Sequence, residues 1–552
     1  MSRSEVGKSG EQRSRAQVIW LAAIVFAAVL PYIPSLSGGF VLDDTGLIIH
    51  NPLAHSLSRL GRAFLTRFLH GTESQFHYYR PLIIISYQIN YALSGPHAFP
   101  FRLTNLLLYA AVAVLVYILA KRLTGSALIA GIAGLAFAVL PSHAESVAFI
   151  AGRTDVIATL FILTGLLVFI SASRRHEFSW LLALLCSALF LCAEMSKEMG
   201  LLLPALMAAY VWTFGENERR KDLWKWTAAL LPSLVIYLLL RSHALNGVAG
   251  QDSGLIFQRM LRVGPVFVTY LRMLFVPREL ALDYNICPLR SITLSPIVLA
   301  AWLVPIGLII TIVLLRKRNP VLSFGAAWIF LSLLPVVDII STNTRIPTER
   351  FCFTASVGSA MVLGWLFKRI LDLRPKSMQI WPLLAGVVVS SYLLYSAALA
   401  VQDAQVYRTN LSWARYVAVT KPEWWAFRAI AGSILYRAGD LKAAVSEYEA
   451  AVKMDEITEF DKAMAENQMG LAWVGIGDMS KAAEAFTRAT EHQPSLASAW
   501  LNLGRAELEL KNYNAAVAAY ERAGKIKKLS AKDSSELSNA YRLAGQNKKA
   551  AD

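Results

Sequence analysis

Long apolar blocks fill residues 18–402, and a mixed, polar segment follows them. A helix that crosses about 30 Å of hydrocarbon needs roughly 20 apolar residues. We predict eleven such spans, several of them short: 18–36, 103–120, 127–141, 156–171, 178–195, 199–214, 226–240, 296–315, 321–340, 353–367 and 380–401. The segment 82–93 is also apolar, but Ser86, Gln88 and Asn90 interrupt it, and we expect it on the membrane surface. The sequence therefore predicts a multi-pass membrane helix bundle.

The basic residues indicate how this bundle is oriented. The net charge of +16 lies largely in short clusters between apolar blocks, such as 121–122, 219–221 and 316–318, and not in one basic surface. Cytoplasmic loops carry an excess of Lys and Arg, so we expect a cytoplasmic N-terminus. The long loops 37–102 and 241–295 and the C-terminal segment then lie outside.

Only 17% of the residues are charged, against about a quarter in soluble domains, which argues against a disordered chain. Nucleic-acid binding is disfavoured as well.

The C-terminal segment has an internal repeat. Gly470, Gly504 and Ser538 stand 34 residues apart, and Phe486 and Tyr520 repeat in step with them. This period, with small residues where helices touch and aromatic residues that fill the gap, is typical of tetratricopeptide repeats. Such arrays bind peptides or partner proteins along a concave face. A rigid spacer or a dimerisation module is the alternative.

Two domains follow from these patterns. Residues 1–402 form the membrane domain, and residues 403–552 form an extracytoplasmic α-solenoid that begins with a joining helix at 403–424. The fold class is therefore all-α throughout.

Two adjacent acids follow the first span in the stretch GGFVLDD. Asp43 and Asp44 lie near an apolar surface, where neighbouring carboxylates can have separated pKa values. One of them could then act as a base at neutral pH. The alternative is a solvated turn after Gly38 and Gly39.

A second polar group lies in the short outer loop PSHAESVAFIAGRTD. It contains His143, Glu145, Arg153 and Asp155, which could hold a phosphate or a sugar. His143 and Glu145 could instead bind a metal, although two ligands at this spacing are weak support. A loop that only caps its neighbouring helices remains an alternative.

Further charged residues are expected on the same outer face. Lys197 and Glu198 lie between two spans, Asp283 and Tyr284 lie in the second long loop, and Arg350 lies at the outer mouth of the tenth span. Polar groups at membrane depth are functional candidates by default, and Arg suits bidentate phosphate binding. Interface anchors and snorkelling side chains are the alternatives. Their convergence on one face predicts a lipid-linked anionic substrate.

The motifs FVLDDTGLIIHNP, YYRPLIIISYQINY, LPSHAESVAFIAGRTD, EMSKEMG, VPRELALDYN and PTERFCFTASVG occur in this order, followed by the repeats. In this arrangement the chain resembles the transmembrane and tetratricopeptide-repeat O-mannosyltransferase family. The resemblance implies a GT-C glycosyltransferase fold. It also implies transfer of a sugar, mannose in this family, from a polyprenyl-phosphate carrier to Ser or Thr hydroxyls of extracytoplasmic proteins. The small number of repeats suggests a bacterial member, in the inner membrane.

The resemblance also implies roles for the polar residues. Asp43 would be the general base of an inverting reaction, and Asp44 would orient it or the acceptor. The donor phosphate or sugar would be bound by His143, Arg153, Lys197 and Arg350. The supporting residues would be Glu145, Asp155, Glu198, Asp283 and Tyr284. No metal or other cofactor is required, although the acid pair leaves a divalent metal possible.

Three other functions remain open at this point. The same lipid-linked sugar could be transferred to a cell-envelope lipid or glycan. The chain could be a membrane scaffold built on its repeats, with outer loops that are only structural. A transporter is the third, but it would need charges inside the bundle and internal symmetry.

Overall fold

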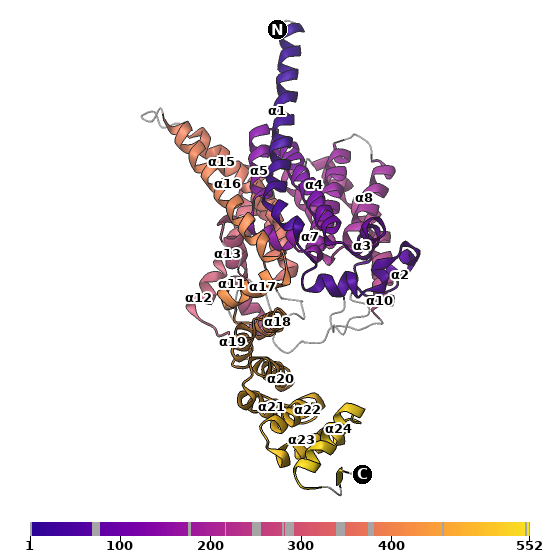
Figure 1. Cartoon of the computed structure of the whole chain (residues 1–552). Helices are drawn as coiled ribbons and strands as arrows, with labels where there is room; N and C mark the ends of the chain where they lie inside the picture. Colours follow the sequence, from indigo (N-terminus) through magenta and orange to yellow (C-terminus); the bar gives the residue numbers. More distant parts are fainter. Residues whose placement is uncertain are drawn as a thin grey trace. The chain divides into compact units, whose positions relative to one another are not determined.

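A computed structural model describes residues 3–68, 78–174, 178–215, 217–245, 256–278, 281, 292–337, 348–373, 380–454, 457–546 and 549–550. All regular secondary structure in these ranges is helical, which confirms the all-α prediction. Residues 281–283 aside, the chain divides into two compact units, one ending at Thr409 and the other beginning at Asn410 (Figure 1). Each unit is described here by itself.

The first unit contains the apolar helices. In the described part of the chain, seven stretches are long and apolar enough to cross a membrane: Arg15–Ser37, Ala98–Thr124, Ile150–Ser173, Asp222–Ala244, Pro296–Leu315, Glu349–Asp372 and Trp381–Val406. They correspond to α1 (Arg3–Val29) with η1 (Leu30–Ser37), α4 (Ala98–Thr124), η6 (Ile150–Gly152) with α7 (Arg153–Ser173), α10 (Asn217–Ala244), α12 (Pro296–Ala301) with α13 (Leu303–Leu315), η9 (Glu349–Phe351) with α15 (Cys352–Asp372), and α16 (Trp381–Val406). The chain is thus a membrane protein.

The other four predicted spans also coincide with helices, but less simply. One is a bent pair, in which α5 (Ala127–Ala138) meets η5 (Pro141–His143) and α6 (Ala144–Ala148) at 58°. The remaining three are shorter apolar helices: α8 (Trp180–Glu194), η7 (Glu198–Leu201) with α9 (Leu202–Phe214), and α14 (Pro320–Leu333) with η8 (Leu334–Val336). The segment expected on the membrane surface is α3 (Pro81–Ser94), a helix of 14 residues. Its position relative to the bilayer, like the count of eleven crossings, stays a prediction.

Local sequence explains the tight turn between α4 and α5. Gly125 ends α4 with a φ of +69°, a left-handed conformation that glycine adopts readily. Ser126 then caps α5, because its side chain accepts a hydrogen bond from the backbone of Ile129. The basic residues Lys121 and Arg122 lie in the last turn of α4, where they suit the negative end of the helix dipole.

Close helix contacts fix α15, the helix that follows Arg350. A Cβ added to Gly358 of α15 would lie 2.6 Å from the carbonyl oxygen of Gly325 on α14. A Cβ added to Gly364 would lie 2.6 Å from the carbonyl oxygen of Ile129 on α5. Small residues let membrane helices approach this closely. The middle of α15 is therefore held against two neighbouring helices.

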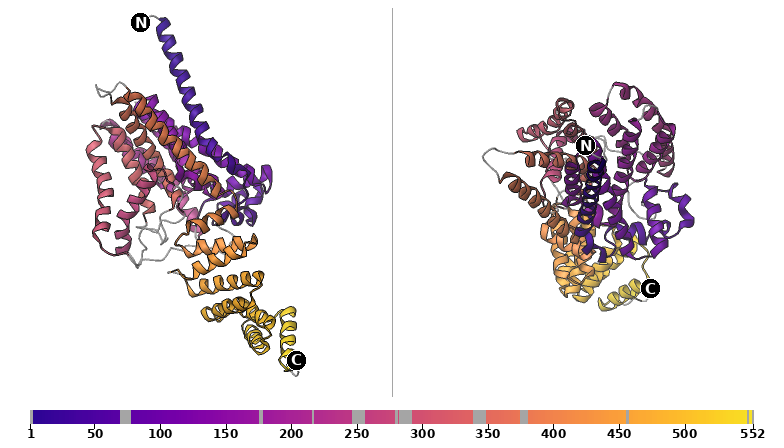
Figure 2. Two further views of the ribbon diagram at one scale, coloured as in Figure 1. Left: turned by 60° about the vertical axis from the view of Figure 1, so that its left-hand side comes forward. Right: turned by 90° about the horizontal axis from the view of Figure 1, so that it is seen from above.

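The second unit begins with α17 (Asn410–Thr420), which lies within the predicted joining segment. Three helix pairs follow: α18 (Trp425–Arg437) with α19 (Leu441–Val452), α20 (Glu459–Ile476) with α21 (Met479–His492), and α22 (Ala497–Glu509) with α23 (Tyr513–Ile526). A single helix, α24 (Ala531–Leu543), comes last. Figure 2 shows the pairs stacked in sequence, as expected for an α-solenoid. The ring of Trp413, which is buried, meets Phe427 edge-on at 5.6 Å.

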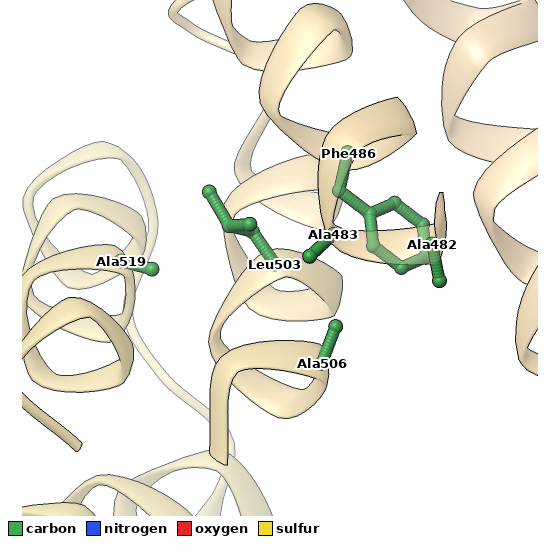
Figure 3. Close-up of a cluster of buried hydrophobic side chains, with 6 residues drawn as sticks. All are labelled: Ala482, Ala483, Phe486, Leu503, Ala506 and Ala519. Carbon is green, nitrogen blue, oxygen red and sulfur yellow. The ribbon is translucent and has the colours of Figure 1, made fainter. Parts of the chain in front are cut away.

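The predicted repeat positions at Gly470, Gly504, Phe486 and Tyr520 lie where the pattern places them, and Gly432 with Tyr448 forms the same contact one repeat earlier. A Cβ added to Gly432, Gly470 or Gly504 would lie 2.9, 2.5 or 2.9 Å from the aromatic ring of Tyr448, Phe486 or Tyr520 respectively. Each glycine thus makes room for the ring of the second helix in its own pair. Figure 3 shows the core around the second ring, where the following residues gather: Ala482, Ala483, Phe486, Leu503, Ala506 and Ala519.

Candidate active site in the first unit

The acid pair lies in a tight turn after η1. The Asp44 carboxylate accepts hydrogen bonds from the backbone N–H of Val41 at 3.0 Å and from that of Ala151 at 2.8 Å. Leu42, which follows Val41 in this turn, has a φ of +47°, which is uncommon for a residue with a Cβ. Asp44 is fully buried, whereas Asp43 is exposed. The turn therefore uses Asp44 as an anchor and turns Asp43 toward solvent.

The two acids differ in their surroundings as well as in their exposure. Burial raises the pKa of Asp44 to about 7, against the lowering effect of its two backbone donors and of Arg102. The pKa of Asp43 is also raised, because the protein surrounds this carboxyl even though its surface is accessible. The positive charge of Arg350 opposes that rise. An accessible carboxylate with a raised pKa has the properties of a general base.

Arg102 of α4 holds the glycine stretch in front of the acids. Its guanidinium donates to the carbonyl oxygens of Gly39 at 2.6 Å, Ala148 at 2.6 Å and Tyr407 at 2.8 Å. A Cβ at Gly38 would lie 2.3 Å from the carbonyl oxygen of Arg408, so the chain can pass here only as glycine. Sequence reasoning missed Arg102, because nothing in its own surroundings in the sequence points to these distant carbonyls.

Two of the predicted phosphate-binding residues are bound within the protein. Arg153 is fully buried and donates to Asn105, Asn90, Ser86 and the Phe101 carbonyl. It therefore has acceptors on every side of its guanidinium.

His143 is likewise buried, and both its ring nitrogens have partners. Nδ1 lies 2.9 Å from the Tyr109 hydroxyl, and Nε2 lies 2.8 Å from the Ser356 hydroxyl. The rings of Phe137 and Phe353 pack against it at 4.6 and 4.7 Å. This environment suits a residue that supports the bundle, and the role in donor binding stays an untested prediction for both His143 and Arg153.

The other two predicted cations lie together. Lys197 is buried, and its Nζ lies 2.5 Å from Oδ1 of Asp155 at the start of α7 and 4.9 Å from the centre of the Phe351 ring. The Arg350 guanidinium lies 5.5 Å from the same ring. Its Nε is 3.8 Å from a carboxylate oxygen of Glu145. Phe351 thus lies close to both cations.

Electrostatic interactions connect this cluster with the acid pair. Arg350 interacts with Asp43, Glu145 and Asp155. Burial lowers the pKa of Lys197, and Arg80 and Arg350 lower it further, while Asp155 opposes the change. Asp43, in the first outer loop, is therefore influenced by the positive charge of Arg350, which lies just before the tenth predicted span.

Arg80 joins the same cluster, and sequence reasoning had given it no role. It lies directly before Pro81 of α3 and donates from Nη2 to Oε2 of Glu198 at 3.0 Å. Its guanidinium lies 4.4 Å from the Tyr78 ring and 5.6 Å from the Phe68 ring. A signal was present in the motif YYRPL, where one charged residue precedes an apolar run.

We call the following seven residues the polar cluster: Asp43, Arg80, Glu145, Asp155, Lys197, Glu198 and Arg350. It holds three cations and four carboxylates, drawn from five separate stretches of the chain. Within the residues that the structure describes, no group of three or more His, Cys, Asp or Glu is arranged to hold a metal ion. Asp283 and Tyr284, both predicted to support the site, lie outside the described residues.

An apolar pocket of about 620 Å³ lies apart from the polar cluster. Its walls come from α9, α10, α13 and α14, with Ala205, Ala209 and Trp212 contributed by α9. It shares no lining residue with the cluster, but α9 follows directly on η7, which begins with Glu198. Because its walls are apolar, the pocket offers no acid, base or charged group for catalysis.

Comparisons with known proteins match both units. Residues 81–243 match the family described as dolichyl-phosphate-mannose-protein mannosyltransferase, and residues 428–458 and 467–528 match tetratricopeptide repeats. A protein O-mannosyl-transferase of Caenorhabditis elegans is 25% identical over 66% of this chain and 53% of its own length. The human protein O-mannosyl-transferase TMTC2 is 35% identical over 32% of this chain and 22% of its own length. The chain thus spans about half, or less, of these relatives.

Among solved structures, the oligosaccharyltransferase of Archaeoglobus fulgidus in its apo form has a TM-score of 0.43, with 14% identity over 73% of this chain and 57% of that one. We draw nothing further from a likeness of this size. The sequence matches in both units, found beside the membrane helices and the stacked repeats, confirm that the chain resembles the transmembrane and tetratricopeptide-repeat O-mannosyltransferases.

Proposed function

We propose that the chain transfers a sugar, mannose by analogy with its relatives, from a polyprenyl-phosphate carrier to Ser or Thr hydroxyls of extracytoplasmic proteins. The observation that carries the proposal is the position of Asp43, an exposed carboxylate with a raised pKa that interacts with the half-buried cation Arg350. A sugar phosphate is attacked at its anomeric carbon while its phosphate leaves. A base and a cation on neighbouring groups suit those two events.

In the proposed reaction, Asp43 takes the proton of the acceptor hydroxyl as its oxygen forms a bond to the anomeric carbon. The bond from that carbon to the phosphate oxygen breaks, and the electron pair leaves with the polyprenyl phosphate. Attack from the face opposite the leaving group inverts the anomeric centre. Arg350 and Lys197 stabilise the charge on the leaving phosphate, and Glu145 and Asp155 hold these two cations in place.

Asp44 is a positioning residue in this proposal. Its carboxylate ties the turn that carries Asp43 to the backbone of Ala151, near the start of α7. His143 and Arg153, whose polar atoms are bound within the protein, would keep the same loop in place. The site faces the outer side of the membrane, in the bacterial inner membrane if the chain is bacterial. The apolar pocket along α9 is suited to part of an isoprenoid tail.

The central test replaces Asp43 with Asn, which has the same size but cannot accept a proton. We expect sugar transfer to fall by about 10²–10⁴-fold, the range of general-base catalysis, with no change in folding. Mass spectrometry of envelope proteins should show the loss of a hexose on Ser or Thr. Asp222→Asn, on the partly exposed Asp222–Lys225 pair of α10, is the matched control. Full transfer activity in Asp43→Asn would exclude Asp43 as the base.

The repeats are proposed to recruit the acceptor protein, since such arrays bind extended peptides. Deletion of residues 425–552 should then abolish protein glycosylation and leave donor binding intact. Unchanged glycosylation would favour a spacer. If the deletion removed a glycosylated lipid or glycan and left glycoproteins unchanged, the acceptor would be a cell-envelope component.

A further inference from the structure

Arg80 is held in the polar cluster by contacts that leave part of its guanidinium unused. Glu198 accepts one hydrogen bond from Nη2 at 3.0 Å, and the rings of Tyr78 and Phe68 lie 4.4 and 5.6 Å away. The Nε atom of Arg80 is buried and has no hydrogen-bond partner among the described residues. A planar guanidinium fixed by a ring on its face and an acid at one end is oriented for an acceptor at its remaining edge.

Arg350 shows the same feature. Its Nε is also buried without a hydrogen-bond partner in the described part of the chain, and its nearest carboxylate oxygen, on Glu145, lies at 3.8 Å. Buried N–H groups without acceptors are rare in folded proteins, because the protein loses the hydrogen bonds that water would make. Two such groups on the cations of one cluster point to an acceptor that binds there.

The unused donors of the cluster indicate what that acceptor is. Arg80 and Arg350 both interact electrostatically with Lys197, and both make it harder for that amine to hold its proton. Each cation already has a carboxylate near it, so the two unused Nε–H groups, and not an excess of positive charge, determine the kind of acceptor. A phosphate oxygen accepts hydrogen bonds from the Nε edge of an arginine, and its negative charge strengthens them.

We propose that Arg80 is a donor-binding residue, and that Arg80 and Arg350 bind the phosphate of the lipid-linked sugar together, with Lys197 beside it. This inference rests on the proposed function, since it takes the ligand to be an isoprenoid phosphate. Glu198 holds Arg80 in its oriented position while the phosphate is absent. Because its carboxylate competes with the phosphate for the same guanidinium, Glu198 limits the affinity of the site for the donor.

The opposite roles of Arg80 and Glu198 make the inference testable by binding alone. The full chain in nanodiscs is titrated with undecaprenyl monophosphate, and with undecaprenol as the uncharged probe. We expect the wild type to prefer the phosphate. Arg80→Gln should weaken phosphate binding at least tenfold and leave undecaprenol binding unchanged. Glu198→Gln keeps an oxygen that can accept the Arg80 hydrogen bond but removes the charge, so it should bind the phosphate as tightly as the wild type or more tightly.

Two further variants serve as controls. Arg59→Gln removes an arginine that lies in the same long outer loop and donates to the Pro52 carbonyl, and it should behave as the wild type does. Arg80→Lys keeps the charge but has no Nε edge, and it should bind the phosphate with intermediate affinity. It also provides the measurement if Arg80→Gln does not fold.

Each outcome separates the inference from the proposed function. A wild type that binds undecaprenol as well as its phosphate would overturn the lipid-phosphate donor itself. A wild type that prefers the phosphate, with Arg80→Gln and Arg80→Lys equal to it, would overturn the role of Arg80 alone. An equal loss of affinity in Arg80→Gln and Glu198→Gln would assign both residues to a purely structural ion pair.

Discussion

The two units use charged side chains in different ways. In the repeat unit, ion pairs join the two helices of one pair or helices of neighbouring repeats. Arg488, for example, donates twice to Glu466, at 2.9 Å each. In the membrane unit, Lys197 and Asp155 form a buried pair across separate stretches of the chain, and the nearby arginines keep unused donors. Charges in the repeats therefore serve packing, whereas those of the polar cluster are incompletely paired, as expected of a binding site.

The largest expected effect in this comparison comes from breaking the buried pair. Lys197→Met leaves the Asp155 carboxylate buried with a single hydrogen bond, from the Thr154 hydroxyl. Removing one partner of a buried pair costs about 3–5 kcal/mol of folding stability. Transfer activity should also fall about 10²-fold or more, because a cation beside the leaving phosphate is lost. Thermal unfolding of the full chain in detergent and a transfer assay measure the two effects.

The contrasting substitution, at an exposed pair of the repeat unit, is Lys462→Met. Lys462 pairs with Glu459, whose side chain is 61% exposed, and such surface pairs contribute little to stability. We expect no measurable change in activity and a small change in the unfolding temperature. If the two methionine variants lost equal stability, the distinction between the units would be wrong.

The acid pair provides a second, smaller effect, which depends on pH. Asp43 acts as a base only when ionised, and its pKa is raised by burial. The transfer rate should therefore fall as the pH is lowered, with a midpoint above the ordinary Asp pKa of about 3.9. Below that midpoint, the rate should fall tenfold for each pH unit. An acid limb that persists in Asp44→Asn belongs to Asp43. A limb that disappears there would belong to Asp44, whose pKa is about 7.

Sequence patterns predicted the repeat unit in detail, because each of its contacts recurs at a fixed spacing. The 34-residue period by itself places Gly470 and Phe486 at positions that pack together. Most apolar helices of the membrane unit were predictable for a similar reason, since their apolar length marks them. The helix α11 (Ile256–Phe275), inside the predicted second outer loop, was not foreseen. Except for Arg80, the members of the polar cluster were foreseen as outer charges, but their pairings were not. The bonds from Arg102 to Gly39 and Tyr407 join distant stretches through backbone oxygens, which no sequence pattern marks.

Gly470→Ala tests the other side of the comparison, and among the variants expected to be impaired it should have the smallest effect. The new Cβ would lie 2.5 Å from the ring of Phe486, which is buried, so the ring or the helix must shift. Such overpacking costs about 1–3 kcal/mol, partly offset by the roughly 1 kcal/mol that alanine gains over glycine within a helix. A Cβ added at Gly386 in α16 meets no atom within 4 Å, so Gly386→Ala measures the gain of alanine over glycine alone. A repeat unit built on periodic packing should lose stability in Gly470→Ala and keep donor binding. A loss of donor binding would instead mean that the repeats contribute to the polar cluster.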